Sequence, residues 1–370
     1  MDKFFEMNNV ANIRKDSEYV TNGKLNPKSP IVEIFSDIAF GNDLTKHGKK
    51  VDKIVDRFKE LGERAHNGDY SAKAEINTIV RYAIEPKLLQ AVQLYNFIGT
   101  YKEIPYNEQP MVKTYKHESI RSQIQASQGD VSFATTVWHE YPVKTKTISS
   151  GYAVNYREIA SGNLDKVSEG MDQVQTDMLN KANVYVIHQL YNGIKNATGV
   201  KYFAEAMGLT KGTVDDMIKK VRRFGRVSLA GDYSVVSQLN GFAGFQSTTP
   251  NIAAVPESAM DEVRKTGLLT TYNGSPVIEL PNQYNLTQLN AAGDNFKTYL
   301  PEGLLFGIPQ GAVSPLQIFK RGGLTSMSGN DVVTGTEITR FDMEFAAEVA
   351  KGREFEIGLV SDSNYEVPSI

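Results

Sequence analysis

The sequence predicts an α+β fold, because two different periodicities occupy different parts of the chain. Apolar residues recur every three or four positions in the first hundred residues and again over 164–192, which is the spacing of amphipathic helices. Apolar and polar residues alternate around 141–148 and near the C-terminus, which is the period of strands. Over 200–320, short strand and helix patterns mix with frequent glycine, so a compact α/β region is expected there.

The first hundred residues are expected to be mainly helical. Residues 1–30 are polar and rich in turn formers, and we interpret them as an arm. The next segment predicts an amphipathic helix that begins near Asp43 and stops at Gly68. A second helix is expected to begin at Ser71, and a third at Pro86. The predicted apolar faces are Val51, Ile54, Val55, Phe58 and Leu61; Ile76, Ile79 and Val80; and Leu88, Val92 and Tyr95.

A long two-stranded arm is expected between residues 109 and 159. Its downstream strand is predicted over 137–159, its upstream partner over 109–127, and its polar turn around Gly129. A hairpin with no apolar face on a sheet or helix is marginally stable in water, so a partner outside the chain's own core is expected. In the downstream strand, Val143, Thr145 and Thr147 are predicted to face one way, and Lys144, Lys146 and Ile148 the other.

The longest helical pattern runs from Leu164 to Asn192, with Asn163 as N-cap and Gly193 closing the run. At the rise of an α-helix it would span about 40 Å. Further along, "SPVIELP" follows an Asn-Gly turn and predicts a strand, and "GLLFGIPQGAVSPLQIF" is interpreted in the same way. In the tail, "EFEIGLVSD" predicts a strand, whereas "TRFDMEFAAEVA" fits a strand or a helix.

No motif for catalysis, cofactor binding or metal binding is visible, and none of these activities is expected. The chain has no cysteine, and its five histidines (His47, His66, His117, His139 and His188) show no metal-ligand spacing. We interpret these histidines as surface or interface imidazoles, with His188 packing in the long helix. The net charge is −3 and no run of five like charges occurs, which argues against a dedicated nucleic-acid binder. Neither a membrane span nor a signal peptide is recognisable, so the protein is expected to stay where it is made.

The order of the elements, together with "GSPVIELPNQY" and the segment from "GLLFGIPQGAVSPLQIF" to "EFEIGLVSD", resembles the major capsid proteins of tailed double-stranded-DNA bacteriophages, which have the Hong Kong 97-type fold. The resemblance covers the chain from about residue 70 to its C-terminus. It implies helices leading into a peripheral domain over 70–103 and an extended hairpin loop over 104–150. Residues 1–69 are expected to form an N-terminal arm and helical extension, whose segment 30–68 departs from the family as an added clamp or as a segment removed at maturation. It further implies a peripheral domain with a long spine helix over 151–199, an axial domain over 200–320, and a return to the peripheral sheet over 321–370.

The resemblance also implies a function. Copies of the chain would assemble through pentamers and hexamers into an icosahedral shell that encloses double-stranded DNA without sequence-specific binding. The shell would assemble in the host cytoplasm, with scaffolding, portal and decoration proteins as further partners. The hairpin arm would lie over a neighbouring subunit, which would supply the missing partner. No enzymatic activity, cofactor or membrane is implied.

Four residues of the arm are candidate inter-subunit contacts: Trp138, Tyr141, Lys144 and Lys146. Trp138 is the single tryptophan, and aromatic anchors dominate many interfaces, although it could instead pack on its own chain. The two lysines also fit a solvated strand face. Some members of the family form an isopeptide bond between a lysine of the extended loop and an asparagine of a neighbouring subunit. Lys144 or Lys146, with Asn330, has the residue types that such a bond needs, but no motif assigns the bond to these residues.

Three rival functions stay open at this point. An encapsulin-type compartment shell would share the fold and would be recognised by protein cargo. An α/β enzyme with a site in 200–320 would need a convergent polar pocket. A phage tail or baseplate component would differ in the symmetry of its assembly.

Overall fold

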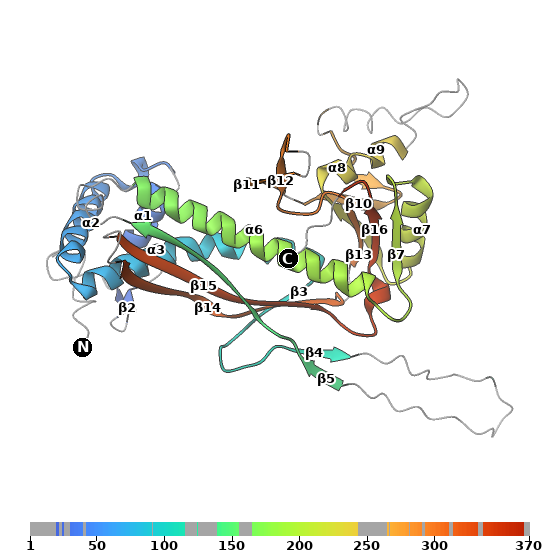
Figure 1. Cartoon of the computed structure of the whole chain (residues 1–370), viewed down its shortest axis with the longest axis horizontal. Helices are drawn as coiled ribbons and strands as arrows, with labels where there is room; N and C mark the ends of the chain where they lie inside the picture. The colour runs from blue at the N-terminus through green and yellow to red at the C-terminus, as the bar shows by residue number, and fades with distance from the viewer. Residues whose placement is uncertain are drawn as a thin grey trace. The chain divides into compact units, whose positions relative to one another are not determined.

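The structure is a computed structural model that describes residues 20–21, 24–25, 30–39, 42–90, 92–114, 124, 139–154, 165–242, 265, 267–280, 282–290, 293–310, 314–331 and 336–365. Helices and strands occupy separate stretches of this part of the chain (Figure 1), which confirms the α+β class. The chain forms two compact units. The first comprises Met1–Leu94, Lys146–Ala182 and Arg321–Phe345, and the second comprises Tyr95–Thr145, Asn183–Lys320 and Ala346–Ile370.

The N-terminal part of the first unit is a cluster of helices built on buried apolar faces. Phe35 of the first helix stacks on Phe58 of the second, with ring centroids 4.5 Å apart. Ile54, Phe58 and Leu61, all predicted for the apolar face, are buried, as is Ile79 of the third helix. The elements are β1 (Val20–Thr21), β2 (Lys24–Leu25), α1 (Pro30–Ala39), a 3-10 turn η2 (Thr45–His47), α2 (Lys50–His66) and α3 (Tyr70–Gln90).

Three predicted helix starts are wrong, for local reasons. Asp43 does not begin α2, which starts at Lys50; the Asp43 carboxylate instead accepts a hydrogen bond from the Thr45 backbone N–H at 2.9 Å, in the turn before α2. Asp69 rather than Ser71 caps α3, accepting from the Ser71 N–H at 2.9 Å. Pro86 lies inside α3, and the next helix, α4 (Val92–Ile98), begins six residues later than predicted.

A four-stranded sheet has the order β3-β14-β15-β6. The segment that fitted a strand or a helix is strand β15, which pairs antiparallel with β6 from Glu337 opposite Val154 to Phe345 opposite Lys146. This pairing within the chain contradicts the prediction that 137–159 forms one strand of a hairpin. The strands are β3 (Thr100–Ile104), β6 (Lys146–Val154), β14 (Leu316–Asp331) and β15 (Thr336–Val349).

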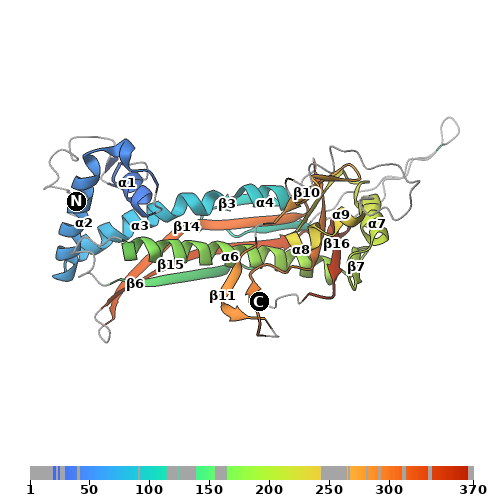
Figure 2. The ribbon, with the colours of Figure 1, turned by 90° about the horizontal axis from the view of Figure 1, so that it is seen from above.

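The long helix α6 (Asp165–Lys195) packs on this sheet along its length (Figures 1 and 2). Gly170 lies against the Tyr152 ring of β6, and Ser150 of β6 donates a hydrogen bond to Asp177 at 3.3 Å. The helix was predicted to end at Gly193, but Gly193 lies inside it and packs against Val349. The predicted N-cap at Asn163 lies outside the described residues.

The second unit contains a six-stranded sheet of order β7-β16-β13-β8-β10-β9. Helix α7 buries Val214, Met217 and Val221 in the core against this sheet, together with Leu229 and Leu305. The strands and helices are β7 (Tyr202–Ala206), α7 (Lys211–Val221), β8 (Arg226–Gly231), α8 (Tyr233–Val236), α9 (Leu239–Phe242), β9 (Thr271–Tyr272), β10 (Ser275–Glu279), β11 (Tyr284–Leu289), β12 (Phe296–Thr298), β13 (Leu304–Gln310), a 3-10 turn η3 (Glu354–Glu356) and β16 (Gly358–Asp362).

The predicted turn and strand near residue 275 are confirmed. Asn273 and Gly274 both have positive φ, at 47° and 75°, as a two-residue hairpin turn requires, and β10 follows. Residues 321–370 were expected to return to the peripheral sheet, but their strands belong to two different sheets. β15 lies in the four-stranded sheet, whereas β16 lies between β7 and β13 in the six-stranded sheet. Phe355 precedes β16, in η3.

None of the helices in the described ranges is long and apolar enough to cross a membrane.

Candidate inter-subunit contact site

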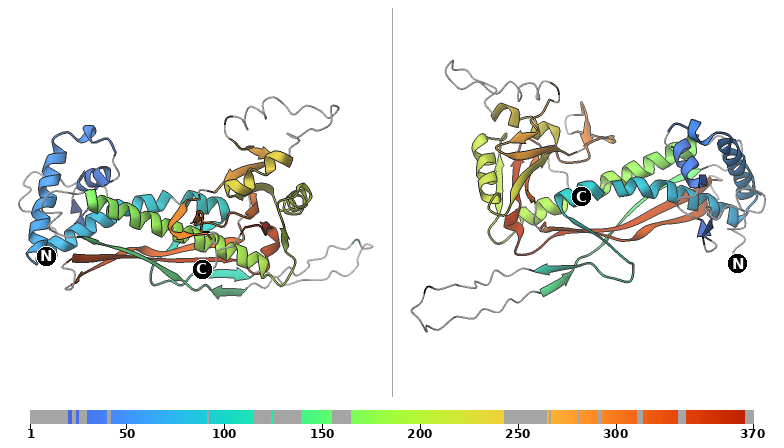
Figure 3. Two further views of the ribbon diagram at one scale, coloured as in Figure 1. Left: turned by 45° about the horizontal axis from the view of Figure 1, so that its top comes forward. Right: turned by 180° about the vertical axis from the view of Figure 1, so that it is seen from behind.

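The base of the predicted arm is an antiparallel strand pair. β4 (Met111–Thr114) pairs with β5 (His139–Pro142), from Met111 opposite Pro142 to Thr114 opposite His139 (Figure 3). An ion pair between Lys113 and Glu140, 3.8 Å from Nζ to Oε1, crosses the two strands. The predicted turn at Gly129 and the candidate anchor Trp138 lie outside the described residues.

A small core on the chain itself holds this base in place. Val112 and Val143 are buried against Phe319, Ala346 and Ala350. The Val143 backbone N–H donates to the Pro110 carbonyl at 2.9 Å, which closes the pair beyond β5. The expectation that the downstream strand finds no core within its own chain is therefore wrong for residues 143–154. The physical reason is a break in the strand at 143–145, after which the chain enters the four-stranded sheet as β6.

Tyr141 contributes its ring to this base. The ammonium of Lys351 lies 4.6 Å from the ring centroid, a cation–π distance. Burial raises the pKa of Tyr141 to about 12, and the nearby carboxylate of Glu348 adds to the increase. The phenol therefore stays neutral over the physiological range, and its ring packs within its own subunit.

Lys144 and Lys146 are both exposed. The predicted alternation is wrong after Lys146, because Ile148 is buried although it was expected to share the face of the two lysines. Lys146 is the first residue of β6 and lies opposite Phe345. Residues 143–145 belong to neither β5 nor β6, so the alternation of side chains in β5 does not continue into β6. The structure thus gives two exposed ammonium groups directly beside the buried base of the arm.

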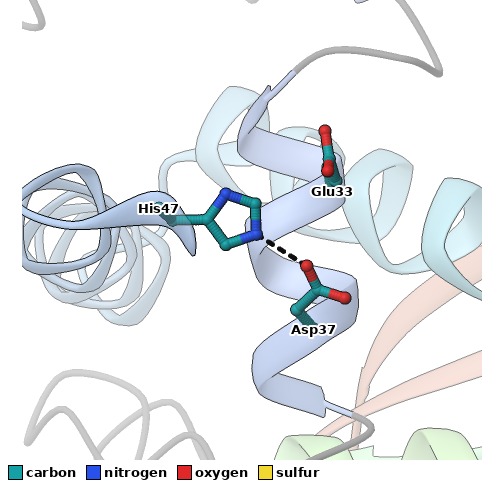
Figure 4. A group of neighbouring side chains, drawn as sticks. All are labelled: Glu33, Asp37 and His47. Carbon is teal, nitrogen blue, oxygen red and sulfur yellow. Dashed lines mark hydrogen bonds and ion pairs between the residues drawn. The ribbon is translucent and has the colours of Figure 1, made fainter. Parts of the chain in front are cut away.

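A second polar cluster joins α1 to the turn that precedes α2. Glu33 and Asp37 lie one helical turn apart on α1, and His47 approaches them from η2 (Figure 4). Their ligand atoms lie within 4.8 Å of one another, which is close enough to hold a metal ion. His47 Nε2 lies 2.6 Å from Asp37 Oδ2, and the His47 side chain is 11% exposed, so of the two predicted positions, surface or interface, the open surface does not apply.

Lys46 already supplies the positive charge at this cluster. Its ammonium lies 2.8 Å from Asp37 Oδ2 and 3.9 Å from Glu33 Oε1. Burial alone would raise the pKa of Asp37, but hydrogen bonds from Lys46, His47 and Asn42 lower it to about 2. We therefore assign the cluster a structural role in fixing α1. Sequence analysis missed it because its residues are spread over two elements without a recognisable spacing.

Comparisons with known proteins were made for both sequence and structure. No curated protein matches the sequence. The "Crystal structure of virus-like particle from Pyrococcus furiosus" is similar over 75% of this chain and 97% of that chain, with 10% identity and a TM-score of 0.44. A structure from Gordonia phage Cozz is similar over 72% and 85%, with 13% identity and a TM-score of 0.47. The "Capsid structure of the Cyanophage P-SCSP1u" is similar over 71% and 86%, with 10% identity and a TM-score of 0.45.

A protein-family model matches residues 7–361, almost the whole chain. The match defines the chain as a capsid protein, a structural component of a particle shell rather than an enzyme. The chain belongs to the family described as "SPbeta prophage-derived putative capsid protein YonB". The resemblance to phage capsid proteins found in the sequence is thereby confirmed, and the function requires association with further copies of the chain.

Proposed function

We propose that copies of this chain assemble through pentamers and hexamers into a closed icosahedral shell around double-stranded DNA. The observation that carries the proposal is the family match over residues 7–361. The formal charge of −3 supports a shell that encloses DNA without binding it tightly. Assembly in the host cytoplasm, and cooperation with scaffolding, portal and decoration proteins, belong to the same proposal.

The hairpin arm supplies one contact between subunits in this proposal. Its base, the β4–β5 pair, is anchored on the chain's own core by the buried side chains of Val112 and Val143. We assign residues 104–150 to an extended loop that lies over a neighbouring subunit, with Trp138, Lys144 and Lys146 in the contact. Tyr141 lies at the base of this loop, in β5.

The domain assignment is part of the proposal as well. Residues 151–199 form the peripheral domain with its spine helix, and residues 200–320 form the axial domain that surrounds the symmetry axes. Helix α6 and the six-stranded sheet support these two assignments. Residues 1–69 form an added N-terminal extension, and 321–370 complete the sheets.

Negative-stain electron microscopy, with a mass measurement on the purified full-length chain, tests the function. Closed particles, or rings of five and six copies, are expected. A stable monomer or dimer at high concentration, with a scaffolding protein supplied, would contradict the proposal. Particles filled with one protein cargo and free of DNA would replace it with the compartment-shell alternative.

A further inference from the structure

The strand pair β11–β12 exposes an apolar surface that the proposed function does not use. The two strands form a sheet of their own, separate from the six-stranded sheet. Leu286 is 72% exposed, Leu289 54%, Tyr284 53% and Phe296 40%. Four large apolar side chains on two short adjacent strands form a concentrated patch rather than scattered surface residues.

This hairpin is firmly attached at its base. Asn282 donates to the Asp232 carboxylate at 2.7 Å and accepts from the Leu300 N–H at 2.9 Å. At the tip, the Asn290 side-chain oxygen accepts from the Gly293 N–H at 2.8 Å, which fixes the turn. The apolar side chains therefore stand on an ordered support, although a two-stranded hairpin alone is marginally stable in water.

The sequence of β11, "YNLTQL", has no charged residue and no proline. Monomeric proteins usually protect exposed strands with lysine, proline or a bulge, because unprotected strands associate with other chains. The register does shift between Asn285 and Leu289, and Leu286, inside that stretch, is nevertheless exposed. This composition is typical of a strand that is covered by another chain.

A second exposed apolar surface flanks β7, the edge strand of the six-stranded sheet. Val200, just before the strand, is 65% exposed, and Met207, just after it, is 81% exposed. Charged residues of both signs accompany these apolar residues: Lys201 and Glu205 are exposed at the β7 surface, and Lys297 is exposed on β12. The two surfaces are alike in apolar character.

Within this unit the elements that carry the two surfaces lie on different sides. β11 and β12 lie on one side, whereas β7 and α7 lie on the opposite side (Figures 1 and 3). Two different patches on opposite sides of one body make a head-to-tail contact, and repetition of that contact closes a ring when the rotation allows it. A second copy of this chain carries both patches, and a capsid protein associates with further copies of itself, so we assign a second copy as the partner.

We propose that the β11–β12 hairpin of one copy packs against the β7 edge of the next copy, with Leu286 and Phe296 covering Val200 and Met207. The contact rests on the proposed shell function and identifies the surfaces that build its rings.

Crosslinking tests the contact directly, because the chain contains no cysteine. We would introduce Leu286→Cys and Met207→Cys together in the full-length chain, treat assembled particles with a short bis-maleimide, and separate the products under denaturing conditions. A ladder of linked chains ending at five or six is expected, whereas each single substitution should give only monomers. The control pairs Leu286→Cys with Tyr70→Cys, an equally exposed residue of the other unit, and should give no ladder.

The outcomes separate this contact from the shell function. Particles that yield only monomers from the double variant, or dimers from Leu286→Cys alone, would overturn the contact and leave the shell intact. Failure of the wild-type chain to form any particle would contradict both. As a second readout, Leu286→Glu and Met207→Glu should each reduce particle yield at least tenfold, while Tyr70→Glu leaves it unchanged; normal yield from both patch variants would also overturn the contact.

Discussion

Gly193 of α6 lies directly against Val349 of β15: a Cβ on Gly193 would come within 2.7 Å of the Val349 Cγ2. Side chains do not tolerate such a distance without movement of one of the two elements. The glycine therefore allows the helix to approach the strand at this point, rather than ending the helix as a C-cap glycine would.

We expect Gly193→Ala to destabilise the protein by about 1–3 kcal/mol, because overpacking of a filled core outweighs the gain in helix propensity. Urea denaturation followed by circular dichroism measures the loss. Gly212→Ala is the matched control, since Gly212 also lies in a helix but has no atom within 4 Å of the added Cβ. An equal effect of both substitutions would show that backbone propensity, not contact with Val349, determines the result.

The contrast between helix body and helix end shows what sequence can predict. The body of α6 was predictable because Val174, Met178 and Ala182 recur at helical spacing and are buried. Its C-terminal end was not, because the position of Gly193 is understood only once Val349 is placed beside it. The predicted helix starts at Asp43 and Ser71 were wrong for a related reason. The Asp43 carboxylate bonds to the backbone of a turn before the helix, and the Asp69 carboxylate caps α3 in place of Ser71.

Substitutions of Val143 and Lys144, two neighbouring residues at the arm base, should differ in their effects on stability and on assembly. Val143→Ala is expected to destabilise the protein by about 2 kcal/mol, because Val143 is 4% exposed and its methyl groups fill the small core. Lys144→Ala should leave the unfolding midpoint unchanged and reduce particle yield, because its ammonium is exposed and assigned to the contact with a neighbour. Unfolding curves and particle yields for both variants make the comparison. Normal particle yield from Lys144→Ala would remove that lysine from the contact.

The low pKa of Asp37 predicts a specific loss of stability in acid. A carboxyl group whose pKa falls from 3.8 to about 2 on folding stabilises the folded state above pH 3.8, and this contribution disappears as the pH falls toward 2. Asp37→Asn should therefore cost about 2 kcal/mol near neutral pH, and its stability should approach that of the wild type near pH 2.

Unfolding free energies measured from pH 7 to pH 2 test this expectation. Asp56→Asn is the control, because the Asp56 side chain is 77% exposed and its replacement should change stability little at any pH. A constant difference between Asp37→Asn and the wild type across the range would mean that the ion pair with Lys46 does not stabilise the fold.

The candidate contact site was only partly predictable from sequence. Exposure of Lys144 follows from the local strand pattern, whereas the burial of Val143 depends on Phe319 and Ala346, which come from distant parts of the chain. The exposed patch on β11 was missed because alternation in "YNLTQL" indicates a strand without showing which face is covered. Local periodicity predicts elements, and the partners of those elements follow only from their packing.

The structure sets sharp limits on which part of the arm can be removed. Deletion of residues 110–147 should abolish folding, because it removes the buried Val112 and Val143 together with the start of β6. Deletion of residues 115–138, with Thr114 joined to His139 by a two-residue Asn-Gly turn, keeps the β4–β5 pair and this core. The shorter deletion should therefore fold with an unchanged urea midpoint but form no closed shells, since it removes the segment assigned to the neighbouring subunit. Circular dichroism and electron microscopy on the two deletions distinguish these effects, and closed shells from the shorter deletion would show that the arm is dispensable for assembly.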